Sequence, residues 1–339
     1  MKKLLSALIA LAMMLSCLMV PAALADEKIS IVTTIFPIYD WVREVAGSNL
    51  DNIDLTMLLG NGVELHSYQP TVQDIVKVSE SDLFIYVGGE SDAWVKDVLA
   101  TASNPDLRSI NLVEAMGADI KAEEIVEGME HEHEHEEGDA HEEEAHEAEA
   151  HEHEEHEHEE EMDEHVWLSL RNAEKLVQVI ADAMAEIDAA NADAYRVNAA
   201  AYIEKLAALD AEYQKAVDGA SVKTVLFGDR FPFRYMVDDY GLSYYAAFSG
   251  CSAESEASFS TIVFLAQKVN ELDLPAVLSI EGANHKIAET VAATSDHKDA
   301  KILTMDSLQS TTAEQVAQGT TYLSVMESNL AVLKDALTR

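Results

Sequence analysis

Four histidines outside a long acidic stretch are the residues of this chain best suited to specific chemistry: His66, His165, His285 and His297. His66 lies in GVELHSYQPT and His165 in DEHVWLSLRNA, beside aromatic and apolar residues that would hold an imidazole ring in a semi-buried position. Imidazole nitrogen is a common ligand of divalent transition metals, and such a ligand has to be held in place. The two segments therefore predict a metal site rather than two solvent-exposed side chains.

A second group of histidines lies in a low-complexity segment, residues 122–163. Residues 123–164 contain 23 acidic residues and neither Lys nor Arg. Glu and His alternate without an apolar face, so we expect a disordered loop. Each metal ion bound there would have to order the chain, which predicts weak and exchangeable accessory sites. The accessory ligands would be His131, His133, His135, His141, His146, His151, His153, His156 and His158.

The negative charge of the chain indicates which kinds of partner it can bind. The formal net charge is −41 over 339 residues, and it stays negative without the acidic loop. Such a surface repels nucleic acid and anionic lipid and suits cations. We therefore expect a divalent metal ion as partner and no nucleic acid.

The N-terminus predicts export. Lys2 and Lys3 precede an apolar run from Leu4 to Val20, and Ala-Leu-Ala ends at Ala25. This pattern is typical of a signal peptide, residues 1–25, which places the mature chain in the periplasm or at the cell surface. Lipidation at Cys17 and an uncleaved membrane anchor are the alternatives.

Cleavage after Ala25 would leave Cys251, in SGCSAESEAS, as the single cysteine of the mature chain. A lone cysteine forms no internal disulfide, and no histidine partner is evident for it in the sequence. We therefore expect Cys251 to be structural.

The elements that would position the histidines alternate between strand and helix twice along the chain. This predicts an α/β fold with two parallel-sheet lobes, each covered by helices on both faces. The N-terminal lobe would span 26–190, including the loop, and the C-terminal lobe 220–339. A linking helix at 191–219 would join them, and one long helix from about Thr312 to Leu337 would close the chain.

Several motifs together resemble the metal-specific solute-binding proteins of zinc and manganese ABC transporters. They are GVELHSYQPTVQDI, the His-rich loop, DEHVWLSLRNA, FGDRFPFRYMVDDYGL, EGANHKIAETV and MDSLQS, and they cover essentially the whole mature chain. The resemblance implies two α/β lobes joined by a rigid long helix, with one metal ion in the cleft between them. It implies His66 and His165 as two ligands and Asp306, after the last strand, as the fourth.

The third ligand is where this chain departs from the family pattern. The family places a His or Glu early in a segment that ends in an aromatic residue and Gly-Leu. The strictest pairing puts Gly228 there, and the nearest donor is Asp229. Asp229 would otherwise be the N-cap of the following helix. Glu281 and His285 are alternative ligands or supporting residues.

The predicted ligands of the cleft and the histidines of the loop favour different metals. In the family, two histidines with two carboxylates are more typical of manganese, whereas the many imidazoles of the loop suit zinc better. We weigh the loop more and predict Zn²⁺ as the transported ligand, with Mn²⁺ as the alternative. Arg230 and Arg234 would either orient carboxylates near the metal or form surface ion pairs.

The function that the resemblance implies is a monomeric, high-affinity zinc receptor outside the cytoplasm that delivers its metal to an ABC permease. A manganese receptor of the same family is one alternative. A metal buffer or adhesin that acts through the His-rich loop is another. A zinc hydrolase is disfavoured because no HExxH motif lies on a rigid helix, so we predict that the chain is not an enzyme.

Overall fold

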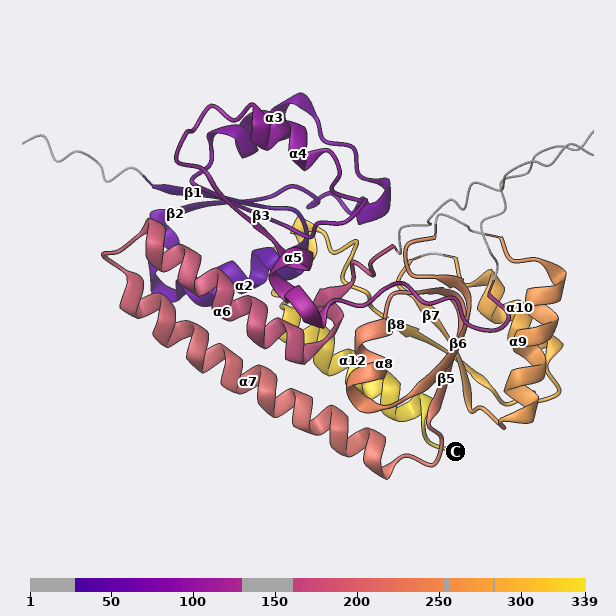
Figure 1. Ribbon diagram of the computed structural model, residues 1–339. Helices are drawn as coiled ribbons and strands as arrows, with labels where there is room; N and C mark the ends of the chain where they lie inside the picture. Colours follow the sequence, from indigo (N-terminus) through magenta and orange to yellow (C-terminus); the bar gives the residue numbers. More distant parts are fainter. Residues whose placement is uncertain (1–27, 130–160, 253–255, 283) are drawn as a thin grey trace, which may run out of the picture.

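A computed structural model of the chain describes residues 28–129, 161–252, 256–282 and 284–339. The N-terminal lobe is built on a four-stranded parallel sheet in the order β2-β1-β3-β4 (Figure 1). The central strands bury β-branched and aromatic side chains, as strands covered on both faces require. The strands are β1 (Ile29–Thr33), β2 (Ile53–Met57), β3 (Leu83–Tyr86) and β4 (Arg108–Asn111).

Helices cover both faces of this sheet. Figure 1 shows α3 and α4 on one side of it and α2, α5 and α6 on the other. The helices are α2 (Phe36–Ala46), α3 (Val72–Glu80), α4 (Val95–Ala100), α5 (Leu112–Met116) and α6 (Leu170–Ile187). Short 3₁₀ turns lie between them: η1 (Gly47–Asn52), η2 (Leu65–Ser67), η3 (Gly117–Asp119) and η4 (Val166–Leu168).

The C-terminal lobe repeats the architecture with a parallel sheet in the order β6-β5-β7-β8. Its strands are β5 (Thr224–Phe231), β6 (Ser243–Ser249), β7 (Ala276–Ile280) and β8 (Lys301–Met305). Its helices are α8 (Arg234–Tyr240), α9 (Phe259–Glu271), α10 (Lys286–Thr294), α11 (Ala313–Ala317) and α12 (Tyr322–Ala336). The predicted fold, an α/β protein with two parallel-sheet lobes, is confirmed.

One long helix runs along both lobes. Helix α7 (Ala192–Gly219) has 28 residues, a length of about 42 Å at 1.5 Å per residue, and Figure 1 shows it beneath both lobes. In the N-terminal lobe it packs against α2 and α6, and towards the C-terminal lobe against α8 and α12. Its Tyr213 hydroxyl donates a hydrogen bond of 2.6 Å to the carbonyl of Met326 in α12. Because α12 also contacts α2, one apolar core extends through both lobes.

The prediction of one long closing helix, from about Thr312 to Leu337, is wrong. The segment forms α11 and α12, separated by a turn in which Gly319 has a φ of +100°. This left-handed conformation favours glycine and ends the first helix. Thr321 then caps α12, because its side chain accepts a hydrogen bond from the backbone of Ser324.

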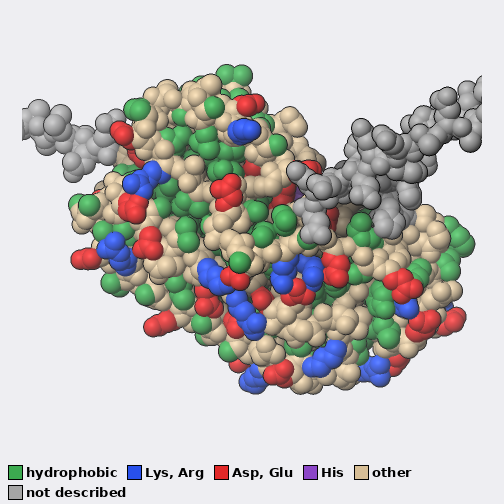
Figure 2. Space-filling model, viewed as in Figure 1, with side chains coloured by type: hydrophobic (Ala, Val, Ile, Leu, Met, Phe, Trp, Pro, Cys, Tyr) green, Lys and Arg blue, Asp and Glu red, His purple; other side chains and the backbone are tan. Residues whose placement is uncertain are grey.

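The surface carries both signs of charge. On the face shown in Figure 2, Lys and Arg side chains lie next to acidic ones. The ion pairs of Arg108 with Glu186 and of Lys175 with Asp119 are formed by exposed side chains. Among the described residues, no helix is both long and apolar enough to cross a bilayer.

Candidate metal centre

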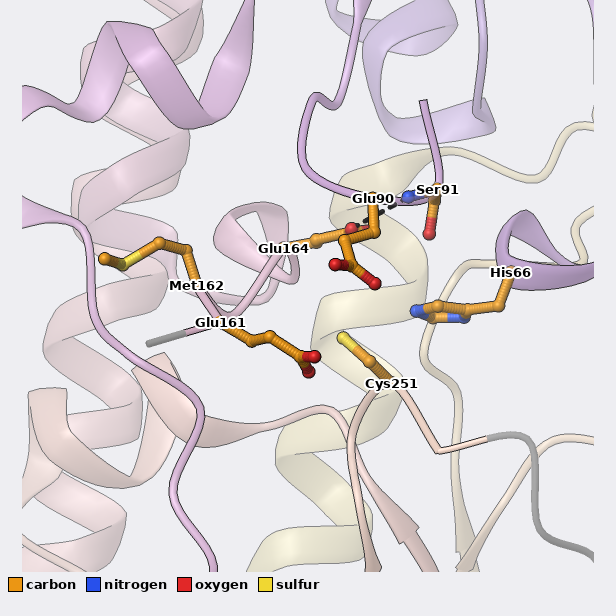
Figure 3. Close-up of a pocket in the computed structure, with 7 residues that line it drawn as sticks. All are labelled: His66, Glu90, Ser91, Glu161, Met162, Glu164 and Cys251. Atoms are coloured by element: carbon orange, nitrogen blue, oxygen red, sulfur yellow. Dashed lines mark hydrogen bonds between the residues drawn. The ribbon is translucent and has the colours of Figure 1, made fainter. Parts of the chain in front are cut away.

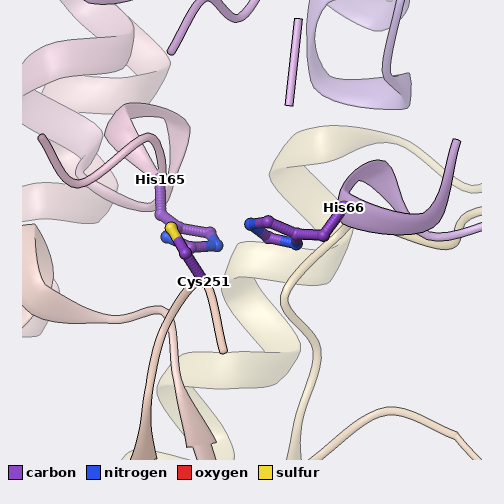
Figure 4. A group of neighbouring side chains, drawn as sticks. All are labelled: His66, His165 and Cys251. Carbon is purple, nitrogen blue, oxygen red and sulfur yellow. The ribbon is translucent and has the colours of Figure 1, made fainter. Parts of the chain in front are cut away.

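Two predicted histidines and one cysteine meet between the lobes (Figure 4). His66 lies in η2, after β2, and His165 lies directly before η4; both belong to the N-terminal lobe. Cys251 follows β6 in the C-terminal lobe. One ligand atom of each residue lies within 4.8 Å of the other two, and the two imidazole ring centroids are 5.3 Å apart. Within the described residues, this is the only such group of three or more potential ligands.

The ring of His66 is held through one nitrogen. Its Nδ1 contacts Oε1 of Glu64, and the same carboxylate oxygen accepts a hydrogen bond of 3.2 Å from Nη1 of Arg230. Burial acts to raise the pKa of Glu64, but the hydrogen bonds and charges of His66 and Arg230 outweigh it, and the pKa is lowered. The Nε2 atom of His66 is buried and has no hydrogen-bond partner.

His165 is held in the same way. Its side chain is 0% exposed, and both its Nδ1 and its backbone N–H lie within 2.9 Å of Oδ1 of Asp163. The following turn is fixed because Trp167 donates a hydrogen bond of 2.9 Å to the carbonyl of Ser307 and accepts one of 2.6 Å from Tyr322. The Nε2 atom of His165 is buried and unpartnered.

The two histidines therefore share an arrangement that is typical of metal ligands. A metal-binding histidine usually donates its second ring N–H to a carboxylate, which fixes the tautomer and leaves the other nitrogen free to bind the ion. An unpaired buried nitrogen would otherwise cost free energy. The pair of free Nε2 atoms indicates where a cation would bind.

Cys251 lies on the wall of an open pocket that His66 also lines (Figure 3). Its backbone N–H donates a hydrogen bond of 2.9 Å to Glu123, and the neighbouring Glu164 accepts one of 3.0 Å from the backbone of Ser91. Burial, followed by the negative charges of Glu123, Asp163 and Glu164, raises the pKa of the Cys251 thiol. Without a cation the sulfur is thus a protonated thiol and a poor nucleophile. The pocket is lined by His66, Glu90, Ser91, Glu161, Met162, Glu164 and Cys251.

Asp229, the predicted third ligand, is not a member of this group. It lies within β5, and its two oxygens accept backbone hydrogen bonds of 2.9 Å from Arg230 and 3.2 Å from Ile280. Burial raises the pKa of its carboxyl group. The alternative expectation, a helix N-cap, is wrong, because α8 begins after Phe233 without a side-chain cap.

The other predicted carboxylates and His285 lie at the carboxyl ends of the C-lobe strands. Oδ1 of Asp306 accepts a hydrogen bond of 2.8 Å from the backbone of Leu308. Burial and the nearby carboxylate of Glu281 raise the pKa of Asp306 to about 6. Glu281 itself accepts hydrogen bonds from Ser307, and His285 contacts Ser279 at 2.7 Å. The ligand roles of Asp229, Asp306, Glu281 and His285 stay predictions.

Cys251 is the residue that reasoning from the sequence missed. It follows a strand, and side chains at the carboxyl ends of parallel strands are where α/β folds place ligands. The position of Cys251 directly after a strand was therefore the one feature of the sequence that could have indicated a ligand. Its histidine partners lie in the other lobe, so no local pattern in the sequence joins them.

The nine loop histidines from His131 to His158, and the predicted signal peptide at 1–25, lie outside the described residues. The two ends of the acidic segment are described. Ala122 and Met162 form an isolated antiparallel bridge, and the backbone of Glu123 donates a hydrogen bond of 2.8 Å to that of Glu161. Both ends therefore meet beside the pocket.

Comparison with known proteins identifies a family that matches nearly the whole chain. The sequence profile of the family described as "Zinc-uptake complex component A periplasmic" matches residues 31–336. The zinc-binding lipoprotein AdcA of Streptococcus pneumoniae is 33% identical over 313 residues, which is 91% of this chain and 56% of that protein. The high-affinity zinc uptake system protein ZnuA of Bacillus subtilis is 30% identical over 92% of this chain and 88% of that protein. The chain thus spans about half the length of the streptococcal relatives it matches.

Solved structures show the same likeness. The Zn(II)-bound ZnuA-like domain of S. pneumoniae AdcA has a TM-score of 0.68 and 28% identity, covering 92% of this chain and 100% of that one. The metal-dependent lipoprotein YcdH of B. subtilis has a TM-score of 0.70 and 26% identity over the same shares.

Proposed function

Because the chain belongs to the family of the periplasmic component A of zinc-uptake complexes, we propose that it is a zinc receptor outside the cytoplasm. It captures Zn²⁺ and delivers it to an ABC permease for import. The observation that carries this proposal is the pair of buried, unpartnered Nε2 atoms of His66 and His165, each with its Nδ1 on a carboxylate. Zinc-binding relatives that share the fold support it.

The position of the site fits capture followed by release. Both histidines belong to one lobe, whereas Arg230 and Cys251 approach from the other. A cation bound between them would tighten the approach of the two lobes at the site, and its loss would loosen that approach while the shared core and α7 keep the lobes joined. The bound and free receptor would then differ in shape, which is what a permease needs to recognise the loaded form.

Binding rather than catalysis is the role that the side chains support. Burial and the surrounding carboxylates raise the pKa of the Cys251 thiol, so it lacks the activation of a catalytic nucleophile. The carboxylates next to the histidines orient imidazoles and are occupied in doing so. We therefore propose a receptor and not a zinc hydrolase, and the same site takes Zn²⁺ in preference to Mn²⁺.

Titration of the mature chain, residues 26–339, with zinc against a competing chelator tests the proposal. We expect one tight site, which His66→Ala and His165→Ala each abolish. His297→Ala is the matched control, because His297 contacts the carbonyl of Leu274 at 2.8 Å and is not a member of the cluster. A tight site that survives both ligand substitutions would overturn the proposal.

We also propose that the His-rich loop acts as a local zinc collector beside this site. Its described ends reach the pocket, and Glu123 and Asp163 contact Cys251 and His165, so a deletion must spare them. Removal of residues 131–158 is expected to abolish weak zinc binding and keep one tight site. Loss of all binding would instead favour a metal buffer or adhesin that acts through the loop.

A further inference from the structure

We propose that Cys251 is the third ligand of the metal centre, so that zinc is held by two imidazoles and one thiolate. This inference rests on the proposed function and adds the C-terminal lobe's donor to it. It proposes a ligand role for Cys251 in place of the expected structural one. The histidines then bind from one lobe and the sulfur from the other.

The geometry of the three side chains carries the proposal. The Cys251 sulfur and one nitrogen of each histidine all lie within 4.8 Å of one another. Zinc binds histidine nitrogen at about 2.0–2.1 Å and cysteine sulfur at about 2.3 Å, so tetrahedral ligands are roughly 3.3–3.8 Å apart. Small side-chain rotations would bring the three ligand atoms from within 4.8 Å of one another to the separation that a zinc ion requires. Independently of the cysteine, the Nε2 atom of the fully buried His165 has no hydrogen-bond partner, which indicates that a ligand binds there.

The position that the family resemblance assigns to the third ligand has no room for a side chain. A Cβ atom at Gly228 would lie 2.4 Å from Cα and 2.6 Å from N of Ala288, so the backbone of α10 fills that space. The neighbouring Asp229 has both oxygens on backbone N–H groups of its own lobe. The C-terminal lobe therefore offers its donor from the loop after β6.

Arg230 brings this loop to the histidines. Its Nη1 atom donates to Glu64, which holds His66, and lies 3.4 Å from the carbonyl oxygen of Ser252, the residue after Cys251. One guanidinium thus fixes the carboxylate behind the first imidazole and the backbone next to the sulfur. The thiol is positioned by the same group that positions the His66 ring.

A thiolate changes which metal the centre selects. Two histidines with carboxylates serve Zn²⁺ or Mn²⁺, whereas the softer cysteine sulfur favours Zn²⁺ and disfavours Mn²⁺. The opposition between the core ligands and the His-rich loop then disappears, because both favour zinc. We expect Cys251→Asp to reduce the preference for zinc over manganese.

X-ray absorption at the zinc K-edge, on the mature chain loaded with one equivalent of Zn²⁺, tests the proposal directly. A thiolate ligand gives a sulfur shell at about 2.3 Å, separate from nitrogen and oxygen at about 2.0–2.2 Å. Cys251 is the only cysteine in residues 26–339, so a thiolate signal can come from no other residue of the mature chain. Zinc bound by loop histidines would show no sulfur shell, because imidazole contains no sulfur. Cys251→Ser should abolish the sulfur shell and weaken zinc binding by more than the roughly 10- to 100-fold that removal of a group outside the coordination sphere costs.

Met162→Leu is the matched control, because Met162 supplies the other sulfur among the residues that line the pocket. It should leave both the sulfur shell and the affinity unchanged. A tightly bound zinc without a sulfur shell, together with unchanged affinity in Cys251→Ser, would overturn the thiolate ligand and leave the receptor function standing. Failure of the wild-type chain to bind zinc tightly would overturn both.

Discussion

Arg230 in the C-terminal lobe donates a hydrogen bond of 3.2 Å to Glu64 in the N-terminal lobe, and Glu64 in turn contacts Nδ1 of His66. The side chains of Arg230 and Glu64 are 18% and 22% exposed, so solvent screens this ion pair less than it would a surface pair. The pair therefore couples the orientation of a metal-facing imidazole to the approach of the other lobe. Of the two roles open to Arg230 from the sequence, support of a carboxylate near the metal is the one that the geometry favours.

Removal of this guanidinium is expected to weaken zinc binding without removing a ligand. In Arg230→Met, Glu64 keeps its contact with His66 but loses the charge that stabilises it as a carboxylate, so the imidazole is less well fixed. We expect a loss of affinity of roughly 10- to 100-fold, as for other groups behind a metal ligand. Arg234→Met is the control, because Arg234 pairs with Glu124 and Asp238. Chelator competition measures both, and equal effects in the two variants would contradict the role of Arg230.

Gly250 allows the close approach of the two lobes at His165. A Cβ atom at this position would lie 2.9 Å from the carbonyl oxygen of Phe231 and 3.0 Å from Cε1 of His165. Gly250→Ala must therefore shift the backbone or the ring, and overpacking of this kind costs about 1–3 kcal/mol. We expect lower unfolding free energy and weaker zinc binding.

Gly219→Ala provides the matched control for that substitution. Gly219 ends α7, and a Cβ atom there would meet no atom of another part of the protein within 4 Å. Replacing a helical glycine by alanine changes stability by up to about 1 kcal/mol, in the favourable direction. Urea unfolding and zinc titration of both variants separate a general effect of added methyl groups from the specific contact at His165. Normal zinc affinity in Gly250→Ala would contradict the expected ring displacement.

The sequence was informative wherever a local pattern determines the structure. Alternating strands and helices predict the two sheets, and the aromatic and apolar neighbours of His66 and His165 predict that each ring is held in a semi-buried position. Gly47, with a φ of +54°, directly follows α2, at the position where a glycine commonly ends a helix. In each case the residues that decide the outcome lie within a few positions of one another.

Tertiary packing decides the features that the sequence did not reveal. The space at Gly228 is filled by Ala288, and Cys251 meets histidines of the other lobe. Neither contact has a signature in the neighbouring residues. Glu64 and Arg230 are likewise 166 positions apart along the chain, and the packing of the two lobes against each other brings them together.

A buried carboxylate in the N-terminal lobe predicts a pH-dependent stability. Asp40 accepts a hydrogen bond of 2.8 Å from the backbone of Tyr322 at the start of α12, and burial raises the pKa of Asp40 to about 6 from 3.8. The folded state thus binds this proton more tightly than the unfolded state. The stability it contributes is present below about pH 4 and is lost as pH rises through about 6.

The difference between wild type and Asp40→Asn isolates this contribution, because asparagine does not titrate. We expect the unfolding free energy of the wild type, relative to Asp40→Asn, to fall by about 1–3 kcal/mol between about pH 4 and about pH 8. Asp193→Asn, which removes the same charge from an exposed position of α7, should show no such change. Urea unfolding of the metal-free chain in chelator measures all three. A difference that is constant with pH would contradict the raised pKa.

Substitution of Asp306 tests whether this residue is the fourth ligand. Asp306 lies outside the cluster of His66, His165 and Cys251. Its carboxylate is buried beside that of Glu281, and asparagine would keep an oxygen to accept the hydrogen bond from Leu308 while removing one of two like charges. We therefore expect Asp306→Asn to raise the stability of the metal-free chain at about pH 8, which lies above the raised pKa of Asp306. We also expect it to weaken zinc binding less than Cys251→Ser does. Thermal unfolding and chelator competition on the two variants provide the comparison, and a loss of zinc binding as large as that of His66→Ala would instead make Asp306 a ligand.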